Sequence, residues 1–366
     1  MALQRTQSLS TSTMTATNIA GHIGRKGELI MVNHNGVYKL HLMDGITPGG
    51  LLLDTSSQRP KGGGFEPVLS PSTMSVEYLV IAGGGGGGGD GHTAGGAGGG
   101  AGGYRSSVPG ESSGENSTAE STLTISKDET YSIVIGTGGV GSTSRSNDGT
   151  DGQPSVFGSI TAIGGGKASH YQSTGGYNGG SGGGGNYNGA GGSGETNQGH
   201  AGGVGQGAGI GTGNRIGGGG GGAGGVGGDS GNGGVGISSL ITGTLVERAG
   251  GGGGGTYSGG TAGSVTGGGG GGGSPTGSHS FGTDGFSATQ NTGGGGGGGT
   301  VGGNDNDRAN GGDGGSGIVI VAYPIALPEL TVDGFTLDST YTYSDSSRSG
   351  YRVYQFLSGS GSISFS

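Results

Sequence analysis

Short apolar segments are spaced widely along the chain and predict strands rather than helices. They are rich in β-branched and aromatic residues, as strands are. No segment repeats apolar residues with the 3.6-residue period of an amphipathic helix, and the intervening glycines would break one. The central segments are Val76–Ala82, Ser121–Ile125, Tyr131–Ile135, Ser159–Ile163, Ile237–Val246 and Ile318–Tyr323. The pattern predicts an all-β chain with no significant α-helix.

Two flanking segments carry strand patterns of their own. In residues 1–66, a polar start gives way to Glu28–Asn33 and Val37–Met43, which flank Asn35-Gly36 and predict a hairpin. A lone hairpin is marginally stable, so we expect partner chains to cover its apolar face. In residues 324–366, an alternating pattern predicts two short strands around Gly359 and Gly361. The chain therefore divides into 1–66, a central module 67–323, and a C-terminal β-segment 324–366.

Glycine dominates the central module. Heptaglycine runs occupy 83–89, 267–273 and 293–299, and hexaglycine runs occupy 217–222 and 250–255. Of the 109 glycines in the chain, 95 lie among the 235 residues from 83 to 317, which is about 40% against a usual share of roughly 7%. Hydrophobic residues make up 27% of the chain, and tryptophan is absent. An ordinary core for a domain of this size needs more apolar surface.

The glycine runs allow two interpretations, a flexible linker or an ordered bundle of extended polyglycine-II-like helices. Linkers are not normally interrupted by apolar strands or by single aromatic residues. An extended three-fold helix makes no internal hydrogen bonds, so neighbouring chains must satisfy its backbone groups. Without Cβ atoms, such rods pack closely and add Cα–H···O contacts. We favour ordered rods, and the three equal heptaglycines, each roughly 22 Å long, predict a slab of one thickness.

Composition excludes several classes of function. The chain has no cysteine, hence no disulfide and no thiolate metal site. Its net charge is −9, and the 15 Lys and Arg residues are scattered, so we expect no nucleic-acid partner. No apolar stretch of about 18 residues predicts membrane insertion, and the N-terminus lacks the apolar run of a signal peptide, so standard secretion is not expected.

Catalytic and metal motifs are weak. G-x-G-x-x-G matches arise by chance in so much glycine, and Ser181, in a G-x-S-x-G match, lacks the strand–turn–helix context of a nucleophile. Histidines stand apart, and no paired carboxylates appear, so we expect neither catalysis nor a cofactor. Asp305, Asp307 and Asp313 could ligate calcium. The calcium-binding nonapeptide does not recur at a fixed period, so a solvated turn is favoured and no metal is expected.

Aromatic residues embedded in glycine and asparagine are the best candidates for contacts with another molecule. One interpretation is that their rings cap rod ends or cover slab faces. The other is an adaptable recognition surface of Tyr, Asn, Ser and Gly, as in antibody loops. The candidate contact residues are Tyr171, Tyr177, Asn178, Tyr187, Asn188, His279, Phe281 and Phe286.

The series "SVEYLVIAGGGGGGG", "AGGAGGGAGGYRSS", "YSIVIGTGGVG", "GTDGQPSVFGSITAIGGG" and "NGGDGGSGIVIVAYP" resembles the glycine-rich module of bacteriophage tail fibres, especially those of marine and cyanobacterial phages. The segment "GELIMVNHNGVYKLHLMDGITPGG" is similar to one near the start of phage fibre proteins. That resemblance implies attachment to the virion and trimerisation. Its candidate attachment residues are Glu28, Leu29, Tyr38, Leu40, Asp44 and Gly45. The C-terminal strands resemble a pair that usually precedes the module, and we expect them to pair back or to cap the fibre.

The resemblance implies a non-enzymatic virion protein, in the tail or another external appendage, that attaches the particle to its host. Its expected partners are two further copies of itself, other virion proteins through the N-terminus, and a host-surface glycan or outer-membrane protein. A capsid-decorating head fibre or a structural tail component without a receptor is the first alternative. A cellular ice-binding or surface-adhesion protein is an alternative of another class, although neither regular threonine faces nor a secretion signal favours it. A depolymerase would need clustered carboxylates, which are missing.

Overall fold

The computed structural model divides the chain into two compact units, Met1–Pro71 and Ser72–Ser366. In the first unit it describes the backbone of four strands. In the second it describes residues 72–89, 95–144, 147–170, 175–207, 215–256, 263–269, 282–300 and 309–366.

The first unit contains a four-stranded sheet in the order β1-β2-β3-β4. The strands are β1 Met14–Thr15, β2 Leu29–His34, β3 Val37–Leu42 and β4 Leu51–Leu53. Strands β2 and β3 are antiparallel and His34 pairs with Val37, which confirms the predicted hairpin. Of the candidate attachment residues, Leu29 lies in β2, and Tyr38 and Leu40 lie in β3. Glu28, Asp44 and Gly45 lie outside the described residues.

The second unit contains two larger antiparallel sheets and a hairpin. One sheet has the order β15-β16-β13-β5-β6, with β7 also paired to β5, and the other has the order β10-β9-β8-β17-β14. Their strands are β5 Thr73–Ile81, β6 Tyr104–Ser106, β7 Leu123–Ser126, β8 Tyr131–Val134, β9 Ser155–Phe157, β10 Ile160–Ala162, β13 Ile318–Pro324, β14 Thr331–Asp333, β15 Tyr341–Ser344, β16 Tyr351–Phe356 and β17 Ser360–Ser364. The hairpin pairs β11 Ile237–Ser239 with β12 Val246–Arg248.

Strands β5 and β13 are apolar without alternation because both of their faces are buried. On one face, Tyr78, Val80 and Val321 pack in a cluster with Phe157 and Ile363 of the second sheet. On the other face, Leu79, Ile81 and Ile320 pack in a second cluster that includes Ile237 of the hairpin. A strand covered on both sides reads as a continuous apolar run, which explains "EYLVIA" and "IVIVAY".

Five of the six central segments predicted as strands are confirmed, as β5, β7, β8, β10 and β13, and one prediction is wrong. Residues 237–246 were expected to form one strand, but they form β11 and the start of β12. Between them the Gly243 N–H donates to the Leu240 carbonyl, and Gly243 has a φ of 88°. This left-handed conformation favours glycine and turns the chain back. The sequence signal for the turn was Gly243 itself.

The C-terminal strands belong to the same sheets as the central module. Strand β16 pairs with β13 from Val319↔Phe356 to Pro324↔Tyr351, so it pairs back as one of the two expectations had it. Strand β17 lies between β8 and β14. The side chains of Phe356, Ile363 and Phe365 are buried. The C-terminal segment therefore supplies part of the core of this unit.

The regular structure of the described residues is β, apart from the single 3₁₀ turn η1 at Gly114–Asn116. This confirms the all-β expectation. Within the described part of the chain, no helix has the length and apolar character needed to cross a membrane.

The polyglycine lattice and candidate binding surfaces

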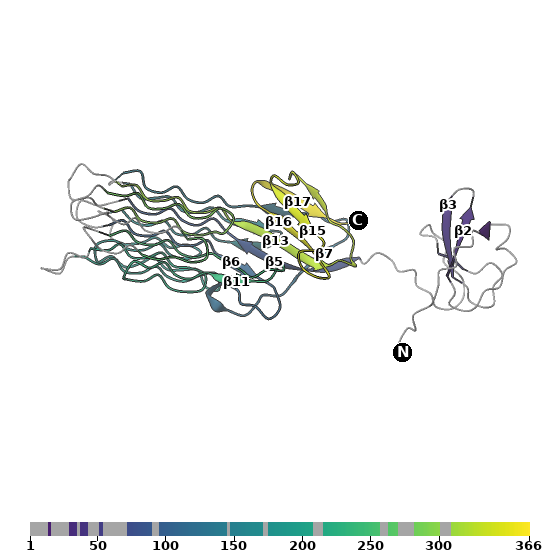
Figure 1. Ribbon diagram of the computed structural model, residues 1–366. Helices are drawn as coiled ribbons and strands as arrows, with labels where there is room; N and C mark the ends of the chain where they lie inside the picture. Colours follow the sequence, from purple (N-terminus) through teal and green to yellow (C-terminus); the bar gives the residue numbers. More distant parts are fainter. Residues whose placement is uncertain are drawn as a thin grey trace. The chain divides into compact units, whose positions relative to one another are not determined.

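Most of the chain between these strands forms extended segments that lie side by side, and we call them rods (Figure 1). The chain leaves a strand along one rod and comes back along another. Strand β5 leads into rod 83–89, and rod 95–103 leads back to β6. In the same way β8 leads into rod 136–142, and rod 147–154 leads back to β9. The strands thus fix one end of the rod bundle.

Rod 83–89 shows the hydrogen bonding of a three-fold helix. The N–H groups of Gly83 and Gly86 donate to rod 147–154, at 3.0 and 2.9 Å. Those of Gly84 and Gly87 donate to rod 309–317, and those of Gly85 and Gly88 donate to rod 95–103, all at 2.8–3.0 Å. Every third residue therefore points to the same neighbour, as three residues per turn require.

The carbonyl groups of the same rod follow the same period with three further neighbours. Gly83 and Gly86 accept from rod 163–170, at 2.9 and 3.0 Å. Gly84 and Gly87 accept from rod 136–142, and Gly85 and Gly88 accept from rod 293–300. Six rods thus surround this one, and its peptide groups are satisfied by other backbones. Within the rod bundle, the lattice of peptide groups takes the place of an apolar core.

The lattice leaves no room for side chains at its interior positions. An ideal Cβ on Gly87 would lie 2.0 Å from the Gly297 carbonyl oxygen, and one on Gly99 would lie 2.2 Å from the Gly85 carbonyl oxygen. A Cβ on Gly220 would lie 1.9 Å from the Gly99 carbonyl oxygen. Such Cα–H groups directed at carbonyls are weak hydrogen bonds that add to the amide bonds. Only glycine allows this separation.

The third heptaglycine does not behave as predicted. Run 83–89 is a rod throughout, and run 293–299 is a rod after Gly293, which ends a turn with a φ of 69°. Gly267 and Gly268 of the third run have φ values of 59° and 83° and form a turn. The Gly269 N–H donates to the Thr266 carbonyl in this turn. Residues 270–273 lie outside the described part of the chain. Here glycine supplies left-handed backbone instead of close packing.

At the outer edge of the lattice, side chains replace neighbouring backbones. The N–H groups of Asn310, Asp313 and Ser316 donate to the side chains of Asp284, Ser287 and Gln290, at 2.7, 3.1 and 3.1 Å. Both sets of residues are spaced by three, which is the period of the rods. A polar residue at every third position therefore closes the edge of rod 309–317.

The same kind of contact involves two of the candidate contact residues. The Asn178 Oδ1 accepts the Ser193 N–H at 2.8 Å, and the Asn188 Oδ1 accepts the Gly207 N–H at 2.8 Å. Both asparagine side chains thus hold rods in register, and each retains an exposed position. A structural role for them is therefore shown, while their contact with another molecule stays a prediction.

The structure places the candidate aromatic residues in two regions. Tyr177 is half-buried on a rod whose Gly176 N–H donates to the Ala190 carbonyl. Tyr187 lies in the turn just before Ala190, so both tyrosines belong to one region. Tyr187 is 39% exposed, with a φ of 44°, and Phe286 is 67% exposed on a different rod. Three further candidates, Tyr171, His279 and Phe281, lie outside the described residues.

Next to Tyr177 a charged cluster joins three rods. The Asp148 carboxylate accepts from the His170 Nδ1 at 2.6 Å and from the His170 N–H at 2.8 Å, and it lies 3.5 Å from the Lys167 Nζ. The Lys167 ammonium lies 4.3 Å from the centre of the Tyr177 ring. Burial raises the pKa of Asp148, but hydrogen bonds from His170 and Tyr177 outweigh it, and the net pKa lies below its ordinary value.

Replacing Asp148 with Asn is expected to destabilise the protein at neutral pH and to have less effect in acid. Because the folded state lowers the pKa of Asp148, its contribution is present above the unfolded pKa of about 3.9 and is lost as pH falls through the folded value. We expect Tm to fall by about 2–4 °C at pH 7. Calorimetry from pH 7 to pH 3 measures the difference. Asp151→Asn is the matched control, because its Oδ1 accepts only the Lys167 N–H at 2.9 Å, and it should lower Tm less at pH 7.

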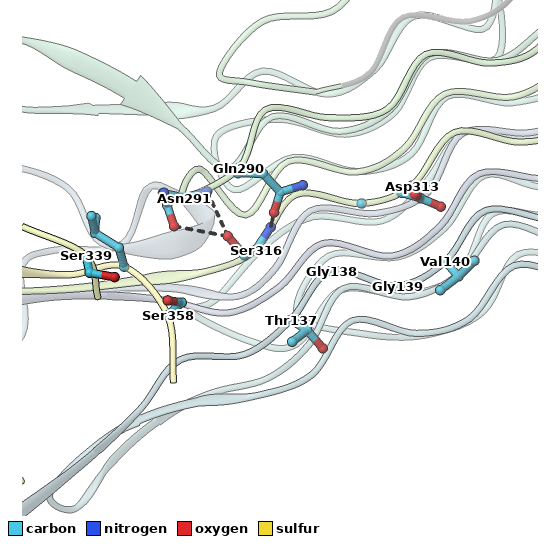
Figure 2. A pocket seen from close by; sticks show the side chains of 12 residues that line it. Thr137, Gly138, Gly139, Val140, Gln290, Asn291, Asp313, Ser316, Ser339 and Ser358 are labelled. Atoms are coloured by element: carbon cyan, nitrogen blue, oxygen red, sulfur yellow. Dashed lines mark hydrogen bonds between the residues drawn. The ribbon is translucent and has the colours of Figure 1, made fainter. Parts of the chain in front are cut away.

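A groove of about 500 Å³ lies where the lattice meets the loops of the C-terminal strands (Figure 2). Rod 136–142 forms one wall, and the turn at Gln290 and Asn291 with Ser316 forms another. Ser339, Leu357 and Ser358 line it from the C-terminal strands. Of the residues that line the groove, only Asp313 was singled out from the sequence, as a possible calcium ligand. A sequence signal for one wall does exist. Asp284, Ser287 and Gln290 are polar residues spaced by three, and the last of them lines the groove.

Two sites considered from the sequence have lattice roles. Ser181 is buried in a rod, where its N–H donates to the Ala101 carbonyl. The Asp313 Oδ1 accepts the Gly141 N–H at 2.8 Å. Asp305 and Asp307 are not among the described residues. In the part of the chain that the structure describes, no three His, Cys, Asp or Glu residues are grouped as metal ligands.

The glycine-rich lattice corresponds to a known protein family. A family described as "glycine-rich domain" matches residues 61–324, which is more than two thirds of the chain. The chain belongs to the glycine-rich domain family. No curated protein matches the sequence.

The matched region of this glycine-rich domain ends at the last residue of β13. Strands β14 to β17 therefore lie beyond it, although β16 pairs with β13 and β17 with β8. In this member of the glycine-rich domain family, the strands that complete both sheets come from outside the matched region.

Proposed function

We propose that this glycine-rich protein is a structural component of a bacteriophage virion, a tail fibre that attaches the particle to the surface of its host. It acts by adhesion and without catalysis. It assembles as a homotrimer and attaches to other virion proteins through the N-terminal unit. The resemblance of the segments from Val76 to Tyr323 and of the N-terminal hairpin to phage fibre proteins supports this assignment.

The observation that carries the proposal is the hydrogen-bonded lattice. Each interior rod is tied to as many as six neighbours, so the bundle is stiff along its length and needs little apolar core. Loops supported by a rigid scaffold are where proteins concentrate recognition. Such a scaffold fits an external appendage that contacts a variable surface.

Two exposed positions support adhesion through aromatic contacts. Tyr187 and Phe286 expose 39% and 67% of their surface, and neither belongs to an apolar cluster of the sheets. Rigid aromatic side chains provide contact area at low entropic cost. We infer that Tyr177, Asn178, Tyr187 and Asn188 in one region, and Phe286 in another, contact a host glycan or an outer-membrane protein.

Two measurements test this function together. Gold-labelled antibodies to the chain should decorate the tail or a tail appendage of purified virions in electron micrographs. The purified full chain, added to host cells before the virions, should slow adsorption. Decoration of the head would instead favour a capsid-decorating fibre. Absence from the virion would contradict the proposal, and ice recrystallisation inhibition would then test the alternative class.

A further inference from the structure

The groove between the lattice and the C-terminal strands presents hydrogen-bonding groups that the fold itself does not use. Gln290 and Asn291 are the main example. The Gln290 Oε1 accepts the Ser316 N–H at 3.1 Å, and the Asn291 Oδ1 accepts the Ser316 hydroxyl at 3.1 Å (Figure 2). Both carboxamides are therefore oriented through their oxygen atoms. Their NH₂ groups have no hydrogen bond within the described residues, so the fold leaves two fixed donors.

The turn that holds these two residues is fixed as well. Asn291 has a φ of 62°, a left-handed conformation that asparagine tolerates better than most residues. Its N–H donates to the Ser316 Oγ at 2.9 Å, so the turn and rod 309–317 are linked in both directions. Donors held in place lose little conformational freedom when a ligand binds.

Rods 309–317 and 136–142 supply acceptors and unpaired backbone groups. The Asp313 Oδ1 accepts the Gly141 N–H, while no bond to its second carboxylate oxygen is present in the described structure. The N–H and C=O groups of Gly138, which also line the groove, have no hydrogen bond among the described residues. Thr137, Ser339 and Ser358 add hydroxyl groups at its margins. The groove therefore presents both donors and acceptors.

The chemistry of the lining excludes most other ligands. It contains no Lys, Arg or His, so nothing there would compensate a phosphate or another anion. Its one carboxylate is too few for a cation site, which needs several oxygen ligands. Val140 and Leu357 are its only large apolar residues, too few for a lipid or a hydrophobic peptide. A volume of about 500 Å³ is within the range of roughly 300–1,000 Å³ usual for small-molecule sites.

We propose that this groove binds an uncharged saccharide of the host-cell surface. The proposal rests on the proposed adhesive function and names its ligand class and a site for it. Adjacent hydroxyl groups of a sugar each donate and accept, so they can bond with the NH₂, carboxylate and backbone groups of the walls. Val140 and Leu357 would contact the apolar face of a pyranose ring. The groove is a different site from the one that the aromatic residues suggest.

The decisive variant is the isosteric pair Gln290→Glu and Asn291→Asp in the full chain. It keeps both oxygen acceptors for Ser316 but removes both outward donors. Binding is measured on an array of neutral and acidic oligosaccharides and then by calorimetric titration with the best neutral one. We expect the wild type to bind at least one neutral oligosaccharide and the pair to bind it at least tenfold more weakly. Ser358→Trp, which fills the groove and leaves the amides intact, should weaken it as well.

Gln198→Glu and Asn232→Asp are the matched control. They make the same chemical change outside the groove and outside the aromatic surface, where the Gln198 Oε1 and the Asn232 Oδ1 also accept backbone N–H groups. The control should bind the neutral oligosaccharide like the wild type, and thermal melts must show that all variants fold. Three results would overturn the saccharide groove. The control alone could lose binding, the wild type could bind only acidic sugars or peptides, or the wild type could bind nothing on the array.

The adsorption assay separates this inference from the proposed function. If the wild-type chain slows adsorption and the groove variants slow it equally, adhesion stands and the groove has no part in it. If the wild-type chain has no effect on adsorption and is absent from virions, the adhesive function fails, whatever the array shows.

Discussion

Replacing Gly87 with alanine is expected to destabilise the protein severely, although only one methyl group is added. The new Cβ would lie 2.0 Å from the Gly297 carbonyl oxygen, and both groups are backbone. Relief requires rod 293–300 to move, and this rod donates from Gly296 and Gly299 to the carbonyls of Gly85 and Gly88. Overpacking and the lost hydrogen bonds together should cost more than about 3 kcal/mol. Calorimetry should show a fall in Tm of about 10 °C or no folded protein.

Gly175→Ala is the matched control for this substitution. A Cβ at Gly175 would find its nearest neighbour, the Ala190 carbonyl oxygen, at 3.7 Å, an ordinary contact. Because alanine restricts the unfolded chain, the control should be neutral or stabilising by up to about 1 kcal/mol. Equal Tm values for the two variants would show that Gly87 is not closely packed.

Phe356→Ala is expected to have the second largest effect, because it removes the ring that joins the C-terminal strands to the module. Phe356 is fully buried, with its ring centre 4.9 Å from that of Phe335 and 5.8 Å from that of Tyr341. Its strand pairs with β13 at Val319. Truncations of this kind cost about 3–5 kcal/mol.

Urea unfolding of the full chain measures this cost. Phe286→Ala, the same substitution at a residue that is 67% exposed, is the control and should change the free energy of unfolding by less than about 0.5 kcal/mol. If Phe356→Ala were as mild as its control, residues 324–366 would be a dispensable addition to the matched domain rather than part of its core.

The sequence was sufficient to predict the strands and the character of the rods. Strand positions followed from apolar runs such as "IVIVAY". Such a run indicates a strand buried on both faces, whichever elements cover it. The rods followed from glycine, since only a residue without Cβ allows backbones to come close enough to bond laterally. Both predictions depend on local properties of single segments.

The neighbours of each rod could not be predicted because one glycine run is chemically the same as another. Run 83–89 lies inside the lattice, while the identical run at 267–273 begins with a turn. What distinguishes rods lies at their ends and edges, in contacts between residues distant in sequence. Asp148 with His170 and Asp284 with Asn310 are examples. The groove shares this difficulty, since its walls come from five separate segments.

Residue-resolved hydrogen exchange of the native chain tests the lattice most directly. Gly138 and Gly139 are adjacent on one rod, but the Gly139 N–H donates to the Gly84 carbonyl at 2.8 Å, while no bond from the Gly138 N–H is present in the described structure. We predict that Gly139 and the interior amides of 84–88 exchange only on global unfolding, whereas Gly138 exchanges orders of magnitude faster. Exchange of the amides of 84–88 at the rate of an unfolded chain would contradict the lattice.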